Sequence, residues 1–258
     1  MNSSECSATQ VSIYVANDIG MGLGKVIAQA AHAYTKAYLD RCQVVESSDD
    51  YVLLKATDVL NKELNSKGFT IPKLVFCPAD FLPEEDEVVS CIVDSGRTVF
   101  GEPTKTCSVS TTKLGTRVDE GERLRFNVGS IPYKQAFFIN RKAVAEAEFD
   151  EHDVITTMAY LSASFVFGDY DYETGELKIL KSSPLYIWLT SAFGKTVVGT
   201  KKPTKFSALI EQLDSDGVTN SVAVSNGQVW GVCTDVLPSD LIHKYTKFKT
   251  FNLLESIK

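Results

Sequence analysis

The sequence lacks the features that mark membrane-spanning, disulfide-bonded and metal-binding proteins. None of its apolar runs approaches the ~20 residues that a membrane-spanning helix needs. The first ten residues lack the cationic and apolar blocks of a secretory signal. The six cysteines include no Cys-x-x-Cys pair, and the three histidines show no ligand spacing. We therefore expect a cytoplasmic protein with free thiols, no metal and no cofactor.

The sequence also lacks a positive net charge. Its formal net charge is −7, whereas a protein that captures nucleic acid by charge is more often basic. A local basic patch stays open, because no acidic residue lies between Glu176 and Glu211. That stretch holds Lys178, Lys181, Lys195, Lys201, Lys202 and Lys205. A phosphate-facing surface would explain this run, and so would a solvated loop and helix edge, which is the commoner case.

Apolar segments alternate between strand-like and helix-like patterns along the chain. The 258 residues are 44% hydrophobic and 23% charged, which is typical of a folded soluble protein with one large or two ordinary domains. We expect strands at 11–15, 51–56, 74–77, 88–93 and 107–110, and helices at 24–41 and 57–66. This alternation predicts the α/β class, with a mixed sheet flanked by helices.

The second part of the chain appears in sequence as a repeat of the first. We expect a strand at 135–140 and helices at 153–167 and 205–213, the second of which would be the counterpart of the helix at 57–66. The segment 185–189 resembles the strand at 51–56. Residues 222–231 align with 92–101, which suggests a duplication. We therefore predict a first unit at 11–111, a linker at 112–132 and a second unit at 133–258.

A glycine-rich loop, Gly20-Met21-Gly22-Leu23-Gly24-Lys25, separates the first strand from the first helix. Such a loop directs backbone N–H groups and one cation toward an anion, although it lacks the Gly-x-Gly-x-x-Gly spacing of dinucleotide sites. A lysine in the first helical turn opposes the helix dipole, so a ligand would explain its presence; a solvated lysine at a loop edge is the alternative. Gln29 and His32 share its helix face, and for His32 a structural or positioning role is favoured.

A second polar group, Asp94-Ser95-Gly96-Arg97-Thr98, follows an apolar strand. Ligand groups of open α/β sheets lie at such strand ends. Asp94 can orient a water or a ribose hydroxyl, and Thr98 and Thr106 offer hydroxyl groups. A turn in which Asp94 caps backbone N–H groups explains the same residues.

Together the two motifs resemble the type-2 peptidyl-tRNA hydrolase family. That family carries a Met-Gly-Lys-Gly-Lys loop, an Ala-Gln-x-x-His-Ala helix and a later Asp-Ala-Gly-Arg-Thr segment. Here the corresponding segments are 21–25, 28–33 and 94–98, and Thr106 fits the family's next threonine. The resemblance covers 11–111, under half of the chain. Residues 237–246 resemble the family's closing segment but lie in the second half.

The resemblance implies a mixed four-stranded sheet flanked by helices in a fold that is usually dimeric, so a tandem copy would mimic that dimer in a monomeric chain. The implied reaction is hydrolysis of the ester that joins a peptide to the terminal ribose of tRNA. The implied catalytic residues are Lys25, Asp94 and Thr98. Lys25 would stabilise charge on the attacked carbonyl or hold a phosphate, Asp94 would position water, and Thr98 would complete the hydrogen bonds. The implied substrate-binding positions are Thr106, Gln29, His32, Gly22, Gly24 and Arg97.

Several positions depart from the family pattern. Leu23 replaces a lysine, Val99 replaces a glutamine, and Glu102 adds an acid where the family has a proline. In the alignment of the two halves, Val224 takes the position of Asp94 and Gln228 that of Thr98, so we expect an inactive second unit. A second interpretation is a tRNA- or protein-binding regulatory protein on the same fold, without turnover.

Overall fold

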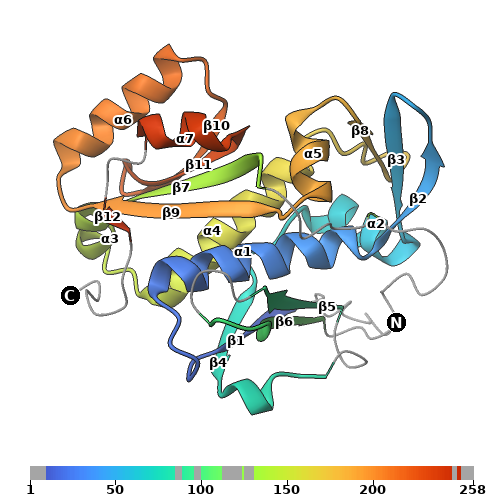
Figure 1. Ribbon diagram of the computed structural model, residues 1–258, viewed down its shortest axis with the longest axis horizontal. Coiled ribbons are helices and arrows are strands. Elements are labelled where there is room, and N and C mark those ends of the chain that lie inside the picture. Colours follow the sequence, from blue (N-terminus) through green and yellow to red (C-terminus); the bar gives the residue numbers. More distant parts are fainter. Residues whose placement is uncertain are drawn as a thin grey trace, which may run out of the picture.

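The computed structural model describes residues 10–84, 89–95, 100–111, 124, 131–245 and 249–250. Over these residues the chain is an α/β protein with two large sheets, one small sheet and seven α helices (Figure 1). The helices are α1 (Leu23–Leu39), α2 (Asp58–Lys67), α3 (Arg141–Glu146), α4 (Glu151–Val166), α5 (Pro184–Thr190), α6 (Pro203–Ser215) and α7 (Ser239–Tyr245), with a short 3-10 helix η1 (Ala79–Phe81). Among these helices, none is both long enough and apolar enough to cross a bilayer.

The strands form three sheets. The first sheet has the order β4 (Lys73–Cys77), β1 (Val11–Ala16), β6 (Thr104–Thr111) and β5 (Ser90–Asp94). The second sheet has the order β10 (Asn220–Ser225), β11 (Gln228–Pro238), β7 (Tyr133–Asn140), β9 (Gly194–Thr200) and β12 (Lys249–Thr250). The small sheet joins β2 (Cys42–Ser47), β3 (Tyr51–Ala56) and β8 (Glu176–Leu180), so a strand from the second half of the chain pairs with a hairpin from the first.

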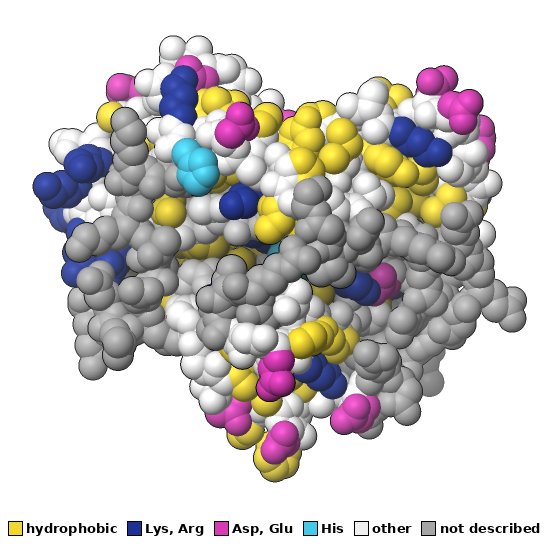
Figure 2. Space-filling model, in the orientation of Figure 1, with side chains coloured by type: hydrophobic (Ala, Val, Ile, Leu, Met, Phe, Trp, Pro, Cys, Tyr) yellow, Lys and Arg dark blue, Asp and Glu magenta, His cyan; other side chains and the backbone are white. Residues whose placement is uncertain are grey.

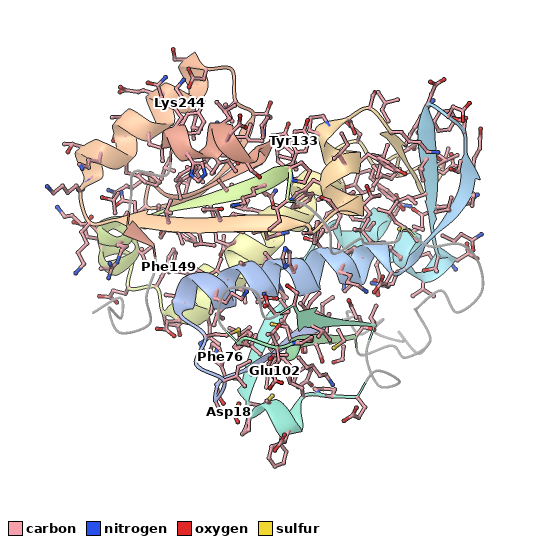
Figure 3. The ribbon with its side chains drawn as sticks, in the orientation of Figure 1. Asp18, Phe76, Glu102, Tyr133, Phe149 and Lys244 are labelled. Carbon is pink, nitrogen blue, oxygen red and sulfur yellow. The ribbon has the colours of Figure 1, made fainter. Side chains whose placement is uncertain are left out.

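Helices α1 and α4 form a central layer between the two large sheets (Figure 1). α1 packs on β5 and β6 of its own half and on β9 of the other, whereas α4 packs on β10 and β11 and on β4 of the other half. At the last of these contacts the ring of Phe76 on β4 meets the edge of the His152 ring on α4, with 5.2 Å between centroids (Figure 3). The packing of the two halves is therefore reciprocal, as in an isologous dimer.

The apolar pattern of α1 follows from this central position. A helix that is buried on all sides is apolar around most of its circumference, and nearly every residue of α1 is buried. Small side chains such as Ala30, Ala31 and Ala33 are fully enclosed and let neighbouring elements approach closely. The hydroxyl of Thr35 lies 3.3 Å from that of Ser162 on α4, which places a polar contact inside the helix pair.

The second sheet is buried on both faces. Along β7, Phe137 and Ile139 face the central helices, while Ala136 and Phe138 face α6 and α7. Since side chains alternate across a strand, a strand covered on both faces is apolar throughout, which explains the unbroken apolar run at 135–139. On β1 the alternation is partial, with Val11, Ile13 and Val15 buried and the residues between them half-buried.

The two large sheets share one strand order. In the first, β1 is parallel to β4 and antiparallel to β6, which is antiparallel to β5. In the second, β7 is parallel to β9 and antiparallel to β11, which is antiparallel to β10. In chain order, β1, α1, β4, β5 and β6 therefore correspond in position to β7, α4, β9, β10 and β11.

A β-bulge occurs at the same place in both sheets. The pairing of β5 with β6 passes over Thr106, between Ile92↔Cys107 and Val93↔Lys105. The pairing of β10 with β11 passes over Trp230, between Ala223↔Gly231 and Val224↔Val229. Because bulges are specific features rather than defects, this shared position fixes which residues correspond.

Many of the expected elements are confirmed. The strands expected around 11–15, 51–56, 74–77, 107–110 and 135–140 and the helices at 24–41, 57–66, 153–167 and 205–213 are present, with bounds shifted by a few residues. Thr57 caps α2 by accepting a hydrogen bond from the N–H of Leu60, and Gly68 ends it with a positive φ of 64°. The expected strand at 88–93 is β5, although Val88 lies outside the described residues.

Other expectations are wrong. The segment 185–189 is helix α5, not a strand like 51–56, because Ser183 caps it and Pro184 occupies its first turn. α6 is not the counterpart of α2, since it lies between β9 and β10. The alignment of 222–231 with 92–101 is shifted by one: the bulge places Ser225, not Val224, at the position of Asp94. The predicted linker at 112–132 lies largely outside the described residues.

Candidate functional site

The centre of the candidate site is an ion pair between Lys25 and Asp94, which are 69 residues apart in sequence. Lys25 lies in the first turn of α1, and Asp94 is the last residue of β5. β5 is antiparallel to β6, and β6 is antiparallel to β1. β5 therefore runs parallel to β1 and to its parallel neighbour β4. Asp94 therefore lies at the carboxyl edge of the parallel strands, the edge where α/β sheets bind ligands.

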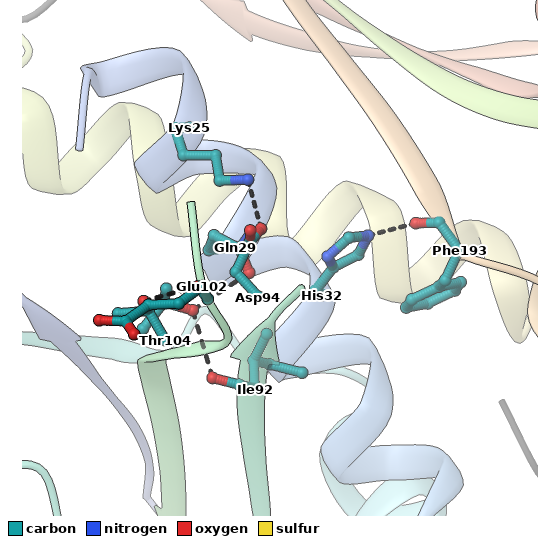
Figure 4. Close-up of polar contacts among 9 residues, drawn as sticks. Lys25, Gln29, His32, Ile92, Asp94, Glu102, Thr104 and Phe193 are labelled. Carbon is teal, nitrogen blue, oxygen red and sulfur yellow. Dashed lines mark hydrogen bonds and ion pairs between the residues drawn. The ribbon is translucent and has the colours of Figure 1, made fainter. Parts of the chain in front are cut away.

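Gln29 also binds the Asp94 carboxylate, and Thr106 in turn contacts Gln29 (Figure 4). The amide Nε2 of Gln29, one helical turn after Lys25, donates to Oδ2 of Asp94 at 2.7 Å. The hydroxyl of Thr106, the bulge residue of β6, lies 3.2 Å from Oε1 of Gln29 and 3.3 Å from the carbonyl oxygen of Ile92. A hydroxyl donates one hydrogen at a time, so Thr106 fixes the orientation of the Gln29 amide only when it donates to Gln29.

The ion pair is partly exposed. The side chains of Lys25 and Asp94 remain 20% and 11% exposed, whereas Gln29 and Thr106 are buried behind them. The ammonium of Lys25 also lies 5.9 Å from the ring centroid of Phe100. An ammonium carries three donors, so Lys25 can keep its bond to Asp94 and donate to a developing oxyanion. The carboxylate can accept a proton from a bound water.

His32 does not join the Lys25–Asp94 pair. Two turns along α1, its Nε2 contacts the backbone carbonyl of Phe193, and its ring stacks on the Phe193 ring with centroids 4.8 Å apart (Figure 4). Because the carbonyl accepts, Nε2 carries the hydrogen. Burial, with the nearby charges of Lys195 and Lys25, holds the pKa of His32 well below its ordinary value. The imidazole is therefore a neutral contact between the two halves.

Phe193 and Lys195 lie near His32, and the sequence did not predict that either would contact α1. Phe193 adopts a positive φ of 51°, which is uncommon for an aromatic residue. Lys195, two residues later, places its Nζ 3.7 Å from the centroid of the Phe193 ring and 4.4 Å from that of Trp188. This ammonium nitrogen is buried, has no hydrogen-bond partner among the described residues, and has a pKa lowered by burial. Apart from the Gly194 that follows, nothing in the sequence predicts the left-handed backbone conformation of Phe193.

The remaining predicted site residues fall into two groups. Gly22 is the N-cap of α1, where its carbonyl accepts hydrogen bonds from the N–H groups of Lys25 and Val26, and Gly24 lies in the first turn. Arg97 and Thr98 lie in 96–99, outside the described residues. The structure thus brings Lys25, Gln29, Asp94 and Thr106 together.

The run of lysines between Glu176 and Glu211 does not form one surface. Lys178 lies on β8, where its ammonium is 3.9 Å from the centroid of the Tyr51 ring. Lys195 points into the core beneath Trp188. Lys201, Lys202 and Lys205 lie exposed at the junction of β9 and α6. The run as a whole is therefore not the single phosphate-facing surface that the sequence left open, and Lys201, Lys202 and Lys205 are the part of it that lies together in an exposed loop and helix start.

The second half lacks the same polar set at the corresponding place. Ser225 occupies the register position of Asp94, and Trp230 that of Thr106. Gln228, which the sequence alignment placed at Thr98, takes the register position of Thr104. Trp230 is buried and its ring meets the edge of the Phe149 ring at 5.4 Å between centroids (Figure 3). An aromatic contact thus takes the place of the Thr106 hydroxyl.

No protein-family model and no curated protein matches this sequence.

Proposed function

We propose that the first half of the chain hydrolyses the ester bond of peptidyl-tRNA or a related aminoacyl ester, and that the second half is a degenerate copy of the same unit. The observation that carries the proposal is the meeting of Lys25 and Asp94, with Gln29 and Thr106 behind them, at the carboxyl edge of the first sheet. These are four of the positions at which the sequence resembles type-2 peptidyl-tRNA hydrolases.

In the proposed reaction, Asp94 orients a water and accepts its proton as the water attacks the ester carbonyl. Lys25 donates a hydrogen bond to the oxyanion that forms, which lowers the barrier because the charge develops beside a fixed ammonium. The bond to the ribose oxygen then breaks, and that oxygen takes the proton back from Asp94 and leaves as a hydroxyl, which restores the carboxylate. The products are the free peptide and tRNA.

The proposed copy in the second half rests on the common strand order and the common bulge. Its lack of a carboxylate at Ser225 and of a hydroxyl at Trp230 supports a role without chemistry. The reciprocal packing of α1 and α4 would then reproduce, within one monomeric chain, the interface of a two-fold dimer.

A time course of peptide release from labelled peptidyl-tRNA tests this function. We expect Lys25→Ala and Asp94→Ala each to lower kcat/KM by about 100-fold or more, because each removes a group that acts on the developing charge. Lys36→Ala is the matched control, since Lys36 lies on the same helix and forms an ion pair with Asp40 away from the site. Wild-type turnover by both site variants would refute the assignment.

One observation favours the alternative, a protein that binds tRNA without cleaving it. Leu23, which stands where the family has a lysine, is only 2% exposed and belongs to the core, so the loop has replaced a cation with a packing residue. In the same assay, a stable complex with peptidyl-tRNA and no release of peptide by the wild type would support this alternative.

A further inference from the structure

The carboxyl edges of the two large sheets carry opposite charge. In the first sheet the parallel pair β1 and β4 ends at Ala16↔Cys77, and in the second the pair β7 and β9 ends at Asn140↔Thr200. These are corresponding positions, because each is the last pair of the corresponding strands. The residues that follow can therefore be compared directly.

After the first pair the chain is acidic. Asp18 follows β1, Asp80 follows β4, and both are exposed. Oδ1 of Asp18 accepts a hydrogen bond from the N–H of Ala79 at 2.8 Å, so this carboxylate helps to hold the turn into η1. Asp18 lies on the part of the molecule formed by the first sheet, away from α6 (Figure 3).

After the second pair the chain is basic. Arg141 and Lys142 follow β7, Lys201 and Lys202 follow β9, and Lys205 lies in the first turn of α6. We call these five residues the basic edge. In Figure 2 the Lys and Arg side chains gather at this end of the molecule, over α3 and the start of α6. Two adjacent strand ends thus project cations side by side.

The exposed lysines of the basic edge differ in whether they form ion pairs. The ammonium of Lys142 lies 3.5 Å from Oε1 of Glu146. Lys201, Lys202 and Lys205 are exposed and form no ion pair with a carboxylate of the described residues. By contrast, Lys244 on α7 pairs with Asp216 at 2.6 Å. Three uncompensated cations on one turn are an unfavourable arrangement for the free protein, which a polyanion would relieve.

We propose that the basic edge binds the phosphate backbone of RNA, and so makes the second half a holder of the tRNA body while the first half acts on the ester. This inference rests on the proposed function for the identity of the polyanion. The net charge of −7 does not oppose it, because charges more than about 8 Å apart are largely screened at physiological salt. The start of α1, which carries Lys25, points toward the same end of the view as the basic edge (Figure 1).

The test compares two triple variants that lose the same charge. K201Q/K202Q/K205Q neutralises the basic edge, and K62Q/K67Q/K178Q neutralises three exposed lysines on α2 and β8. The affinity for deacylated tRNA is measured by fluorescence anisotropy across a series of salt concentrations, after circular dichroism has shown that both variants are folded. Each lysine that contacts a phosphate contributes about 0.7 to 0.9 to the slope of log affinity against log salt.

We expect the basic-edge variant to lose tenfold or more in tRNA affinity and up to about 2.7 units of that slope, and the control variant to match the wild type. With peptidyl-tRNA as substrate, KM rises and kcat does not change, whereas cleavage of a peptidyl-adenosine ester, which lacks the tRNA body, is unaffected. Equal tRNA binding by the two triple variants overturns the inference, as does a wild type that binds an acidic polypeptide but no tRNA.

The outcomes separate this inference from the proposed function. If the wild type releases no peptide but binds tRNA through the basic edge, the hydrolase assignment fails and the RNA-binding surface stands. If the wild type is active and both triple variants bind tRNA alike, the hydrolase assignment stands and the RNA-binding surface fails.

Discussion

Single residues at the site divide the tasks of charge and of orientation. Lys25 and Asp94 carry the charges, and Gln29 links the carboxylate to the buried Thr106 through an amide that donates at one end and accepts at the other. An amide suits this position because a buried donor or acceptor without a partner is costly. A side chain with a different set of donors and acceptors at this position would change where protons lie among Lys25, Asp94 and the replaced residue.

Gln29→Glu tests this division of tasks. The substitution replaces the donor that lies 2.7 Å from Oδ2 of Asp94 with a carboxylate oxygen. Two carboxylates at that distance retain a shared proton to higher pH than one carboxylate does. If Asp94 acts as the base, the acid limb of the pH–rate profile for peptidyl-tRNA hydrolysis moves up by about one unit or more, and kcat at neutral pH falls. The exposed Gln43→Glu is the control, and a profile that stays in place would contradict the role of Gln29.

At the scale of elements, the contact between α1 and the turn before β9 depends on a neutral histidine. The Nε2–H of His32 is held by the carbonyl of Phe193, and the pKa of His32 is lowered chiefly by burial. In the unfolded chain the same group titrates near its ordinary value of about 6.5. Below that pH the unfolded chain binds a proton that the folded protein does not, so acidification reduces the free energy of unfolding.

We therefore expect His32→Gln to be pH-dependent in its effect. Above about pH 7 the variant loses the ring stacking and is less stable than the wild type. As the pH falls below about 6.5, the wild type loses up to about 1.4 kcal/mol per pH unit from this group alone, and the difference between the two proteins shrinks. Urea denaturation at several pH values measures this, with the exposed His243→Gln as control. A difference that stays constant with pH would show that the pKa of His32 is the same in the folded and unfolded states, and would contradict a neutral buried ring.

The elements also show what the sequence can and cannot predict. α1 and the strands β1, β3, β4 and β7 were predictable because their apolar patterns arise from burial that is continuous along each element. β9 was missed because its apolar core of two valines is short and lies between glycines, and the partners that bury it are distant in sequence. α5 was misread because its aromatic residues favour a strand locally, while the cap at Ser183 selects a helix.

Prediction of the site was limited in the same way. Lys25, Gln29, Asp94 and Thr106 lie in recognisable motifs, so their association was expected from the family resemblance. The His32–Phe193 contact spans 161 residues and depends on how the halves pack, which no local pattern encodes. The one-residue error in aligning the halves arose because Ser95, Val99 and Gly101 match Ser225, Val229 and Gly231 at a fixed spacing. The bulge that places Val224 at the position of Val93 is visible only in the pairing of strands.

On the scale of the whole molecule, the two halves share a core. One hydrophobic cluster includes Ile13 and Ile27 from the first half and Phe137 and Met158 from the second. The small sheet adds backbone pairing between β3 and β8. Each half therefore completes the burial of the other, and we expect neither to unfold alone, because a half that remained folded would expose the apolar faces of α1 or α4.

Met158→Ala tests this coupling from the second half. Met158 is fully buried and lies so close to Gly231 that a Cβ there would collide with it, so its truncation is expected to cost about 2–5 kcal/mol. Two probes follow the two halves separately. Both tryptophans, Trp188 and Trp230, report on the second half by fluorescence.

In the first half, burial raises the pKa of the Cys42 thiol to about 12, so alkylation of Cys42, followed by mass spectrometry, reports when that half opens. With a shared core, the two probes give one urea midpoint in the wild type and one lower midpoint in the variant. A variant in which fluorescence shifts while Cys42 stays protected to the wild-type midpoint would mean that the halves are independent domains.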